Sequence, residues 1–218
     1  MRALRVRSTG LSPETRRTMA KLYFRYGAMN SGKSTALLQA AFNYEERGHR
    51  VVLAKPAIDT KVEGEISSRL GMTRGVEILV GVEDSPREQL AALVADGQPI
   101  SCLLVDEAQF LTTWQVDELL RIAVLDGIPV LAYGIRTDFQ TIAFPGSQRL
   151  LEIAHSLEEL KTICRCGRKA IFNGRRVAGE FVFDGGQVAI DQGEVSYESM
   201  CGNCYLEASH GRLGAGRL

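Results

Sequence analysis

The sequence predicts an α/β protein in which helices cover both faces of a mostly parallel sheet, with a small separate lobe after it. Three observations support this prediction. Short apolar segments alternate with helix-forming segments up to about residue 155. A glycine-rich loop joins the first apolar segment to the first helical one. Two close pairs of cysteines bracket a segment near the C-terminal end.

Composition limits the classes of protein to consider. The net charge is zero, with 26 Lys and Arg against 26 Asp and Glu, so we expect neither a polybasic surface nor binding to nucleic acid. No apolar run is long enough to span a membrane, and the arginine-rich residues 1–20 lack the apolar core of a secretory signal. We therefore expect a cytoplasmic protein, no membrane association and no structural disulfides. The polar residues 1–20 predict a disordered N-terminal extension.

The glycine-rich loop fits the phosphate-binding pattern G-x-x-x-x-G-K-[ST], between an apolar strand at residues 22–26 and a helix that follows Ser34. In such a loop the backbone N–H groups and the helix N-terminus converge on phosphate oxygens. Lys33 would reach the β- and γ-phosphates, and the Ser34 hydroxyl would bind Mg²⁺. The pattern predicts that a nucleoside triphosphate is bound by Gly27, Ala28, Met29, Asn30, Ser31, Gly32, Lys33 and Ser34.

Strand and helix signals continue along the chain. Apolar patterning and Gly or Pro stop signals predict, in order, a helix to about Arg47, a strand at 51–54, a loop at 60–75, a strand at 76–80, a helix opened by Ser85 and Pro86, a strand at 100–105, a helix at 114–125, a strand at 128–133 and a helix to about His155. Asp59 follows a strand end, where ligands gather, although a solvated loop residue is an equal alternative. Cys102 lies inside an apolar strand and is expected to be a packed thiol.

Two acids end the strand at residues 100–105. In a P-loop protein the first acid, Asp106, holds Mg²⁺, which leaves Glu107 for proton chemistry. Two roles for Glu107 remain open at this point. It could polarise water in an ATPase, or it could accept a proton from a substrate hydroxyl in a kinase. The predicted nucleotide site therefore also includes Asp106, Glu107, Ala108 and Gln109.

The cysteine pairs predict a metal site. Cys164 and Cys166 precede Cys201 and Cys204, and two close pairs in a cytosolic chain indicate a tetrahedral Cys₄ zinc site, with four unrelated thiols as the alternative. One residue separates the first pair instead of the usual two or more. A closed Cys₄ site has no open position, so the zinc would be structural and would hold a lobe too small to bury a core. Within this lobe we expect short strands at 170–172 and 181–183.

Together these motifs resemble the zinc-containing thymidine kinases of the cellular and bacterial type. The resemblance is carried by residues 28–35, 105–110 and 133–139 and by the two cysteine pairs, and it extends from about Lys21 to Tyr205. It is closest to the enterobacterial members, in which one residue also separates the first two cysteines. The implied organisation is a P-loop NTPase-like nucleotide-binding domain at 21–162, a zinc-binding lasso lobe at 163–205 and a flexible tail at 206–218.

The resemblance also implies an activity, which is phosphorylation of the thymidine 5′-hydroxyl by ATP to give dTMP and ADP. It assigns Glu107 as the general base, and Lys33, Ser34 and Asp106 to the triphosphate and Mg²⁺. It implies a homotetramer that dTTP inhibits as a feedback inhibitor, and a lasso that closes over the nucleoside. The residues that it places around thymidine are Met29, Phe110, Phe139, Phe144 and Tyr197.

The chain departs from many relatives at two positions. Lys61 stands near the phosphates where arginine is common, and Asn173 stands in the lasso where threonine is common. The main alternative function is a zinc-containing P-loop ATPase that acts on nucleic acid. The zero net charge and the lack of a basic and aromatic cluster in the cysteine-bounded segment disfavour that alternative.

Overall fold

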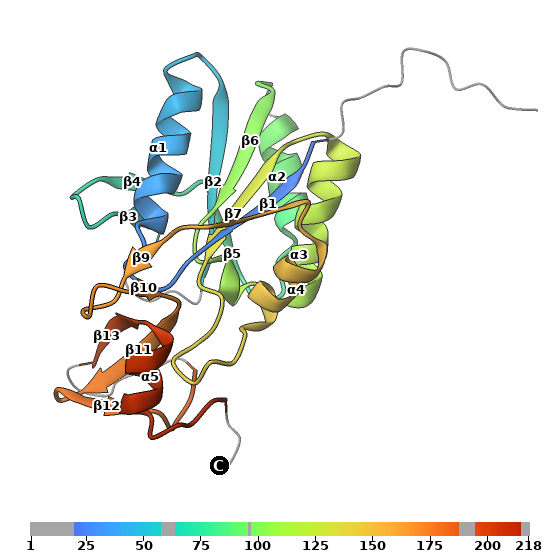
Figure 1. The fold of residues 1–218 in the computed structure, drawn as a ribbon. Coiled ribbons are helices and arrows are strands. Elements are labelled where there is room, and N and C mark those ends of the chain that lie inside the picture. Colours follow the sequence, from blue (N-terminus) through green and yellow to red (C-terminus); the bar gives the residue numbers. More distant parts are fainter. Residues whose placement is uncertain (1–19, 58–63, 96, 188–194, 215–218) are drawn as a thin grey trace, which may run out of the picture.

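The computed structural model describes residues 20–57, 64–95, 97–187 and 195–214. The expectations for the N-terminal extension, for Asp59 and for Lys61 fall outside these residues. Figure 1 shows a sheet flanked by helices, with a small lobe of strands and one helix at the end from which the C-terminus leaves.

The sheet has six strands in the order β5-β2-β6-β7-β1-β8, and every neighbouring pair is parallel. The prediction of a mostly parallel sheet is confirmed. The edge strand β8 was not predicted, because its residues are polar or exposed and lack a strand pattern. The six strands are β1 (Leu22–Tyr26), β2 (Arg50–Pro56), β5 (Ile78–Val80), β6 (Ile100–Val105), β7 (Val130–Gly134) and β8 (Ser156–Glu159).

Helices cover the sheet on both faces, as predicted. Helix α1 lies on one face, and α2 and α3 lie on the other (Figure 1). The Thr112 hydroxyl and the Gln115 side chain form a reciprocal capping box that begins α3, and this helix ends in a π-helical turn (Ile122–Asp126). The main helices are α1 (Lys33–Glu45), α2 (Pro86–Ala95), α3 (Thr113–Arg121) and α4 (Pro145–Ile153).

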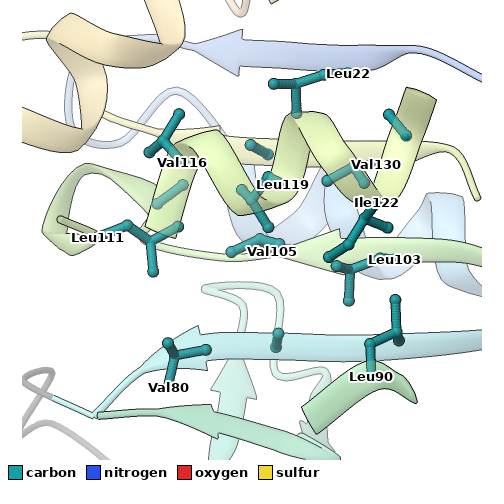
Figure 2. Close-up of a cluster of buried hydrophobic side chains, with 14 of the residues drawn as sticks. Leu22, Val80, Leu90, Leu103, Val105, Leu111, Val116, Leu119, Ile122 and Val130 are labelled. Atoms are coloured by element: carbon teal, nitrogen blue, oxygen red, sulfur yellow. The ribbon is translucent and has the colours of Figure 1, made fainter. Parts of the chain in front are cut away.

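Alternate residues of the central strands feed two separate hydrophobic clusters. In β6, Leu103 and Val105 join the cluster beneath α2 and α3, whereas Cys102 and Leu104 join the cluster beneath α1. Figure 2 shows the first cluster, in which Leu119 of α3 lies over strand residues. The continuous apolar sequence of β6 is thus explained by burial on both faces, and Cys102 is the packed thiol that the sequence predicted.

The stretch predicted as a loop between β2 and β5 contains a hairpin in its described part, so the loop prediction was wrong there. Strands β3 (Glu65–Ser67) and β4 (Thr73–Gly75) pair antiparallel. Arg74 forms a two-pronged ion pair with Glu45 of α1, with N–O distances of 2.6 and 2.5 Å. These strands were missed because three-residue strands rich in Gly, Ser and Thr have the composition of a turn.

The lobe combines two small antiparallel sheets with one helix. The strand predicted at 181–183 corresponds to β12, whereas the strand predicted at 170–172 coincides with β11 only at Phe172. Strand β13, which pairs along the whole of β11, was not predicted. Helix α5 continues into the segment that the sequence assigned to the tail. The elements of the lobe are β9 (Thr162–Ile163), β10 (Lys169–Ala170), β11 (Phe172–Val177), β12 (Glu180–Val182), β13 (Val195–Met200) and α5 (Gly202–Ala208).

Candidate active site

The phosphate-binding loop connects β1 to α1, as its sequence pattern predicted. Gly27 continues the sheet, since its N–H donates to the Gly134 carbonyl at 3.3 Å. A Cβ at Gly27 would lie 2.5 Å from the Leu160 carbonyl oxygen, so this position requires glycine. Gly32 has a φ of 77°, which glycine adopts without strain, and it turns the chain into α1.

Lys33 and Ser34 begin α1 and direct their side chains towards the loop and towards Asp106. The Lys33 ammonium donates to the Ala28 carbonyl at 3.0 Å. Burial lowers the pKa of this ammonium, while the charges of Glu107 and Asp106 act in the opposite direction. The Ser34 hydroxyl donates to Asp106 Oδ2 at 3.0 Å and so joins the end of β6 to the start of α1.

Asp106 has the surroundings of a residue that holds a cation. Its side chain is only 5% exposed, and its Oδ1 has no hydrogen-bond partner among the residues that the structure describes. Burial, together with the neighbouring Glu107 carboxylate, raises the pKa of Asp106 to about 7. A divalent cation held by Oδ1 and the Ser34 oxygen would compensate both the burial of the Asp106 carboxylate and its repulsion by Glu107. Carboxylate and hydroxyl oxygens are also the ligands that Mg²⁺ prefers, so the two residues fit it.

Glu107 lies directly after Asp106 in a left-handed backbone conformation, with a φ of 48°. Its Oε2 accepts a hydrogen bond from Gln109 Nε2 at 2.5 Å. Gln109 is 1% exposed, and its Oε1 accepts from the Ile135 N–H at 3.2 Å. The sequence assigned Gln109 only to the nucleotide site, whereas the structure shows that its side chain orients the Glu107 carboxylate.

The five residues predicted around thymidine fall into four groups. The Phe110 and Phe144 rings meet edge to face at 5.5 Å. Phe139 is buried beneath the Arg175 guanidinium, which lies 3.6 Å from its ring centroid. Met29 contacts the lobe through its backbone. Tyr197 lines a cavity of about 450 Å³ beside Asn30, and the three phenylalanines are not among the residues that line it.

Several lobe residues for which the sequence predicted no role hold the loop that follows β7. The Tyr205 hydroxyl donates to the Phe139 carbonyl at 2.7 Å, and Gln140 Nε2 donates to the Phe183 carbonyl at 3.1 Å. Arg175 lies in register with Tyr197 on the neighbouring strand. No local pattern marks these contacts, because they join residues that are far apart in the sequence.

The four cysteines of the two pairs converge, as predicted. Their sulfur atoms all lie within 4.8 Å of one another, and Cys166 Sγ is 3.5 Å from Cys201 Sγ. A tetrahedral site with metal–sulfur bonds of about 2.3 Å requires sulfurs about 3.8 Å apart, so the cluster fits a metal. Gly167 has a φ of 83°, and its N–H donates to the Cys164 carbonyl, which forms the tight turn of the first pair. None of the five cysteines forms a disulfide.

Comparison with known proteins decides the family. A family model described as "Thymidine kinase" matches residues 20–205. The chain belongs to the thymidine kinase family. A thymidine kinase of Legionella pneumophila (strain Paris) is 48% identical over 89% of this chain and 93% of its own length. A thymidine kinase of Ruegeria pomeroyi is 45% identical over 88% of this chain and 96% of its own length. A thymidine kinase of Yersinia pseudotuberculosis is 47% identical over 87% of this chain and 96% of its own length.

Membership of the thymidine kinase family confirms the resemblance seen in the sequence motifs and removes the alternative of an ATPase that acts on nucleic acid. A solved structure of the Legionella pneumophila ATPase DotB matches 72% of this chain and 45% of its own length, with a TM-score of 0.34 and 17% identity. This likeness is too weak to inform function. Within the described residues, no helix is both long and apolar enough to cross a membrane.

Proposed function

We propose that this thymidine kinase transfers the γ-phosphoryl group of ATP to the 5′-hydroxyl of thymidine, giving dTMP and ADP. The observation that carries the proposal is the hydrogen bond between Ser34 of the phosphate-binding loop and Asp106. It joins the two halves of a nucleotide site, and the next residue, Glu107, has its carboxylate oriented by Gln109. Phosphoryl transfer depends on such positioning and on charge neutralisation more than on covalent help.

In the proposed reaction Glu107 is the general base. Gln109 holds its Oε2, which leaves Oε1 to accept the proton of the 5′-hydroxyl. The 5′-oxygen forms a bond to the γ-phosphorus, and the bond between that phosphorus and the leaving oxygen of ADP breaks. Lys33 balances charge on the β- and γ-phosphates. Ser34 and Asp106 would hold Mg²⁺, which neutralises phosphate charge when it is bound.

The lobe has a separate part in the proposal. Cys164, Cys166, Cys201 and Cys204 would hold a structural zinc ion, since their sulfurs are close enough for one tetrahedral site. The lobe packs against the loop that carries Phe139, and this contact supports the proposal that the lobe covers the nucleoside and excludes water. Around thymidine we keep Met29, Phe110, Phe139, Phe144 and Tyr197 as proposed contacts. Cytoplasmic location, a homotetramer and feedback inhibition by dTTP are further parts of the proposal.

The test is a direct assay. The purified protein is incubated with ATP, Mg²⁺ and thymidine, and dTMP and ADP are quantified. We expect the two products in equal amounts and little ADP when thymidine is omitted. ADP release at the same rate without thymidine, or no dTMP at all, would refute the proposal. Adding dTTP to the same assay tests the inhibition, and sedimentation of the protein tests the tetramer.

A further inference from the structure

Two neighbouring strands of the lobe hold one residue of the phosphate-binding loop. Asn173 of β11 and Ser199 of β13 are direct partners in the antiparallel pair. Asn173 Oδ1 accepts a hydrogen bond from the Met29 N–H at 2.7 Å, and the Ser199 hydroxyl donates to the Met29 carbonyl. The Met29 backbone is therefore fixed at both of its polar groups by residues more than a hundred positions away.

The other end of the Asn173 amide reaches a second segment of the site. Asn173 Nδ2 donates to the Thr137 carbonyl at 3.0 Å, and Thr137 lies two residues before Phe139. Asn173 is 2% exposed and Ser199 is 7% exposed, so these hydrogen bonds lie away from water. A buried polar group that loses its partner is costly, which makes such contacts effective in fixing a conformation.

The phosphate-binding loop has a reason to need this support. Asn30, the residue after Met29, has a φ of 66°, which is uncommon for a residue other than glycine. A strained loop conformation persists only where its surroundings hold it. The N–H groups of the loop bind phosphate in one orientation only, so a contact that fixes Met29 also fixes the loop for its ligand.

We propose that Asn173 is a positioning residue that couples the ATP side of the site to the nucleoside side, by bridging Met29 of the phosphate-binding loop to Thr137 of the loop that carries Phe139. This inference rests on the proposed kinase function. The lobe can then dock on the Phe139 loop only when the phosphate-binding loop has its active conformation, and the reverse also holds. Because both substrates favour that arrangement, each lowers the Kd of the other.

An amide suits this role because it carries an acceptor and a donor on one planar group. This property allows the two contacts to be separated. Asn173→Asp keeps an acceptor for the Met29 N–H but places a second carboxylate oxygen against the Thr137 carbonyl. Asn173→Ala removes both contacts. Ser199→Ala removes only the contact with the Met29 carbonyl. Ser196→Ala is the matched control, since Ser196 is an exposed serine on the same strand.

The kinetic test compares KM and kcat of these variants at a temperature well below their melting points. For Asn173→Ala we expect KM to rise about 5- to 30-fold for both substrates, the effect of losing one buried hydrogen bond on each side. For Asn173→Asp we expect the rise for thymidine, with the KM for ATP within about threefold of wild type. For Ser199→Ala we expect the KM for ATP to rise and the KM for thymidine to stay within about threefold of wild type. A role in global stability alone would lower the active fraction and leave both KM values unchanged.

Hydrogen exchange tests the contact without any assay of activity. The Met29 amide is expected to exchange faster in Asn173→Ala than in wild type, and to keep its protection in Ser196→Ala. Unchanged KM values with unchanged exchange, or equal effects in Ser196→Ala and Asn173→Ala, would overturn the inference. A wild-type protein that phosphorylates no nucleoside would instead refute the proposed function, while the exchange measurement would still decide the Met29 contact.

Discussion

The Glu107 carboxylate and the Gln109 side-chain amide form a hydrogen bond of 2.5 Å between Oε2 and Nε2. Gln109 cannot rotate away easily, because its Oε1 accepts from the Ile135 N–H at 3.2 Å and its side chain is buried. Gly134 makes room for this arrangement, since a Cβ at that position would lie 2.7 Å from Gln109 Oε1. The proposed general base is thus oriented from the end of β7, which is the direct neighbour of β6, the strand that precedes Glu107.

Replacing the proposed base tests its role in proton transfer. Glu107→Gln keeps the size of the side chain but cannot accept the proton of the 5′-hydroxyl. We expect kcat to fall about 10²–10⁴-fold, while binding of an ATP analogue stays within about threefold of wild type. Turnover and analogue binding are measured on the same preparation. Near-normal turnover would assign the proton to another group.

Removing the residue that orients the base tests whether orientation matters. Gln109→Leu fills a similar volume but cannot donate to Glu107 or accept from Ile135. We expect kcat to fall about 10- to 100-fold with a small change in KM, because misplacing a catalytic group slows the chemical step more than it weakens binding. Gln148→Leu, at an exposed position on α4, is the matched control and should leave kcat unchanged. Equal kcat values for the two variants would contradict the orienting role.

The sequence was sufficient for the parts of the site that depend on neighbouring residues. The phosphate-binding loop, the acids at the end of β6 and the cysteine pairs each carry their chemistry within a few positions, so spacing alone predicts them. The tight turn at Gly167 likewise depends on residues close in the sequence. The inner strands β2, β6 and β7 were predictable because burial on both faces produces continuous apolar runs.

The rest depends on contacts between distant residues. Asn173 has no local pattern that points to Met29, and before the structure it was only a departure from the residue common in relatives. Gln109 looked like an ordinary residue after two acids, since its partner Ile135 directly follows another strand, β7. Strands β8 and β13 were missed because an edge strand and a strand of a small lobe need few apolar residues. Pairing with distant segments, more than intrinsic propensity, forms them.

Zinc removal should separate the cysteines into two classes. Metal analysis is expected to return about one zinc ion per chain, and chelation should expose four thiols to iodoacetamide. Cys102 should stay unreactive until the protein unfolds, because it is fully buried and burial raises the pKa of its thiol to about 12. Mass spectrometry of the alkylated peptides identifies which cysteines react. Labelling of Cys102 together with the other four in the folded state would contradict this division.

The Cys102 thiol also predicts how the stability of the protein changes with pH. The folded state keeps the Cys102 proton up to about pH 12, whereas the unfolded state releases it near its ordinary pKa of 9.0. The unfolded state therefore binds fewer protons between these values, and the free energy of unfolding should fall as pH rises through this range. Cys102→Ala, compared with wild type by urea unfolding at pH 8 and pH 10, should lose less stability over the interval. An equal loss in both proteins would contradict the assignment.

Arg175 joins the lobe to a proposed nucleoside residue. Its guanidinium lies 3.6 Å from the centroid of the Phe139 ring and donates to the carbonyls of Asp184 and Gly186 at 2.6 and 2.9 Å. The side chain is 3% exposed. Arg176, the next residue, points to the opposite face of β11 and lies 3.9 Å from the Phe181 ring centroid. The two arginines thus have similar partners on different faces of one strand.

This pair allows a matched test of how the lobe supports Phe139. Arg175→Met keeps an unbranched side chain with an apolar stem but removes the planar cation and its two buried hydrogen bonds. We expect the KM for thymidine to rise about 10-fold and the KM for ATP to stay within about threefold. Arg175→Lys should not restore it, because an ammonium cannot stack on the ring and reach both carbonyls at once. Arg176→Met should leave both KM values near wild type. A similar rise in that variant would mean that the lobe responds to any loss of an arginine on β11, and that Phe139 needs no specific support from Arg175.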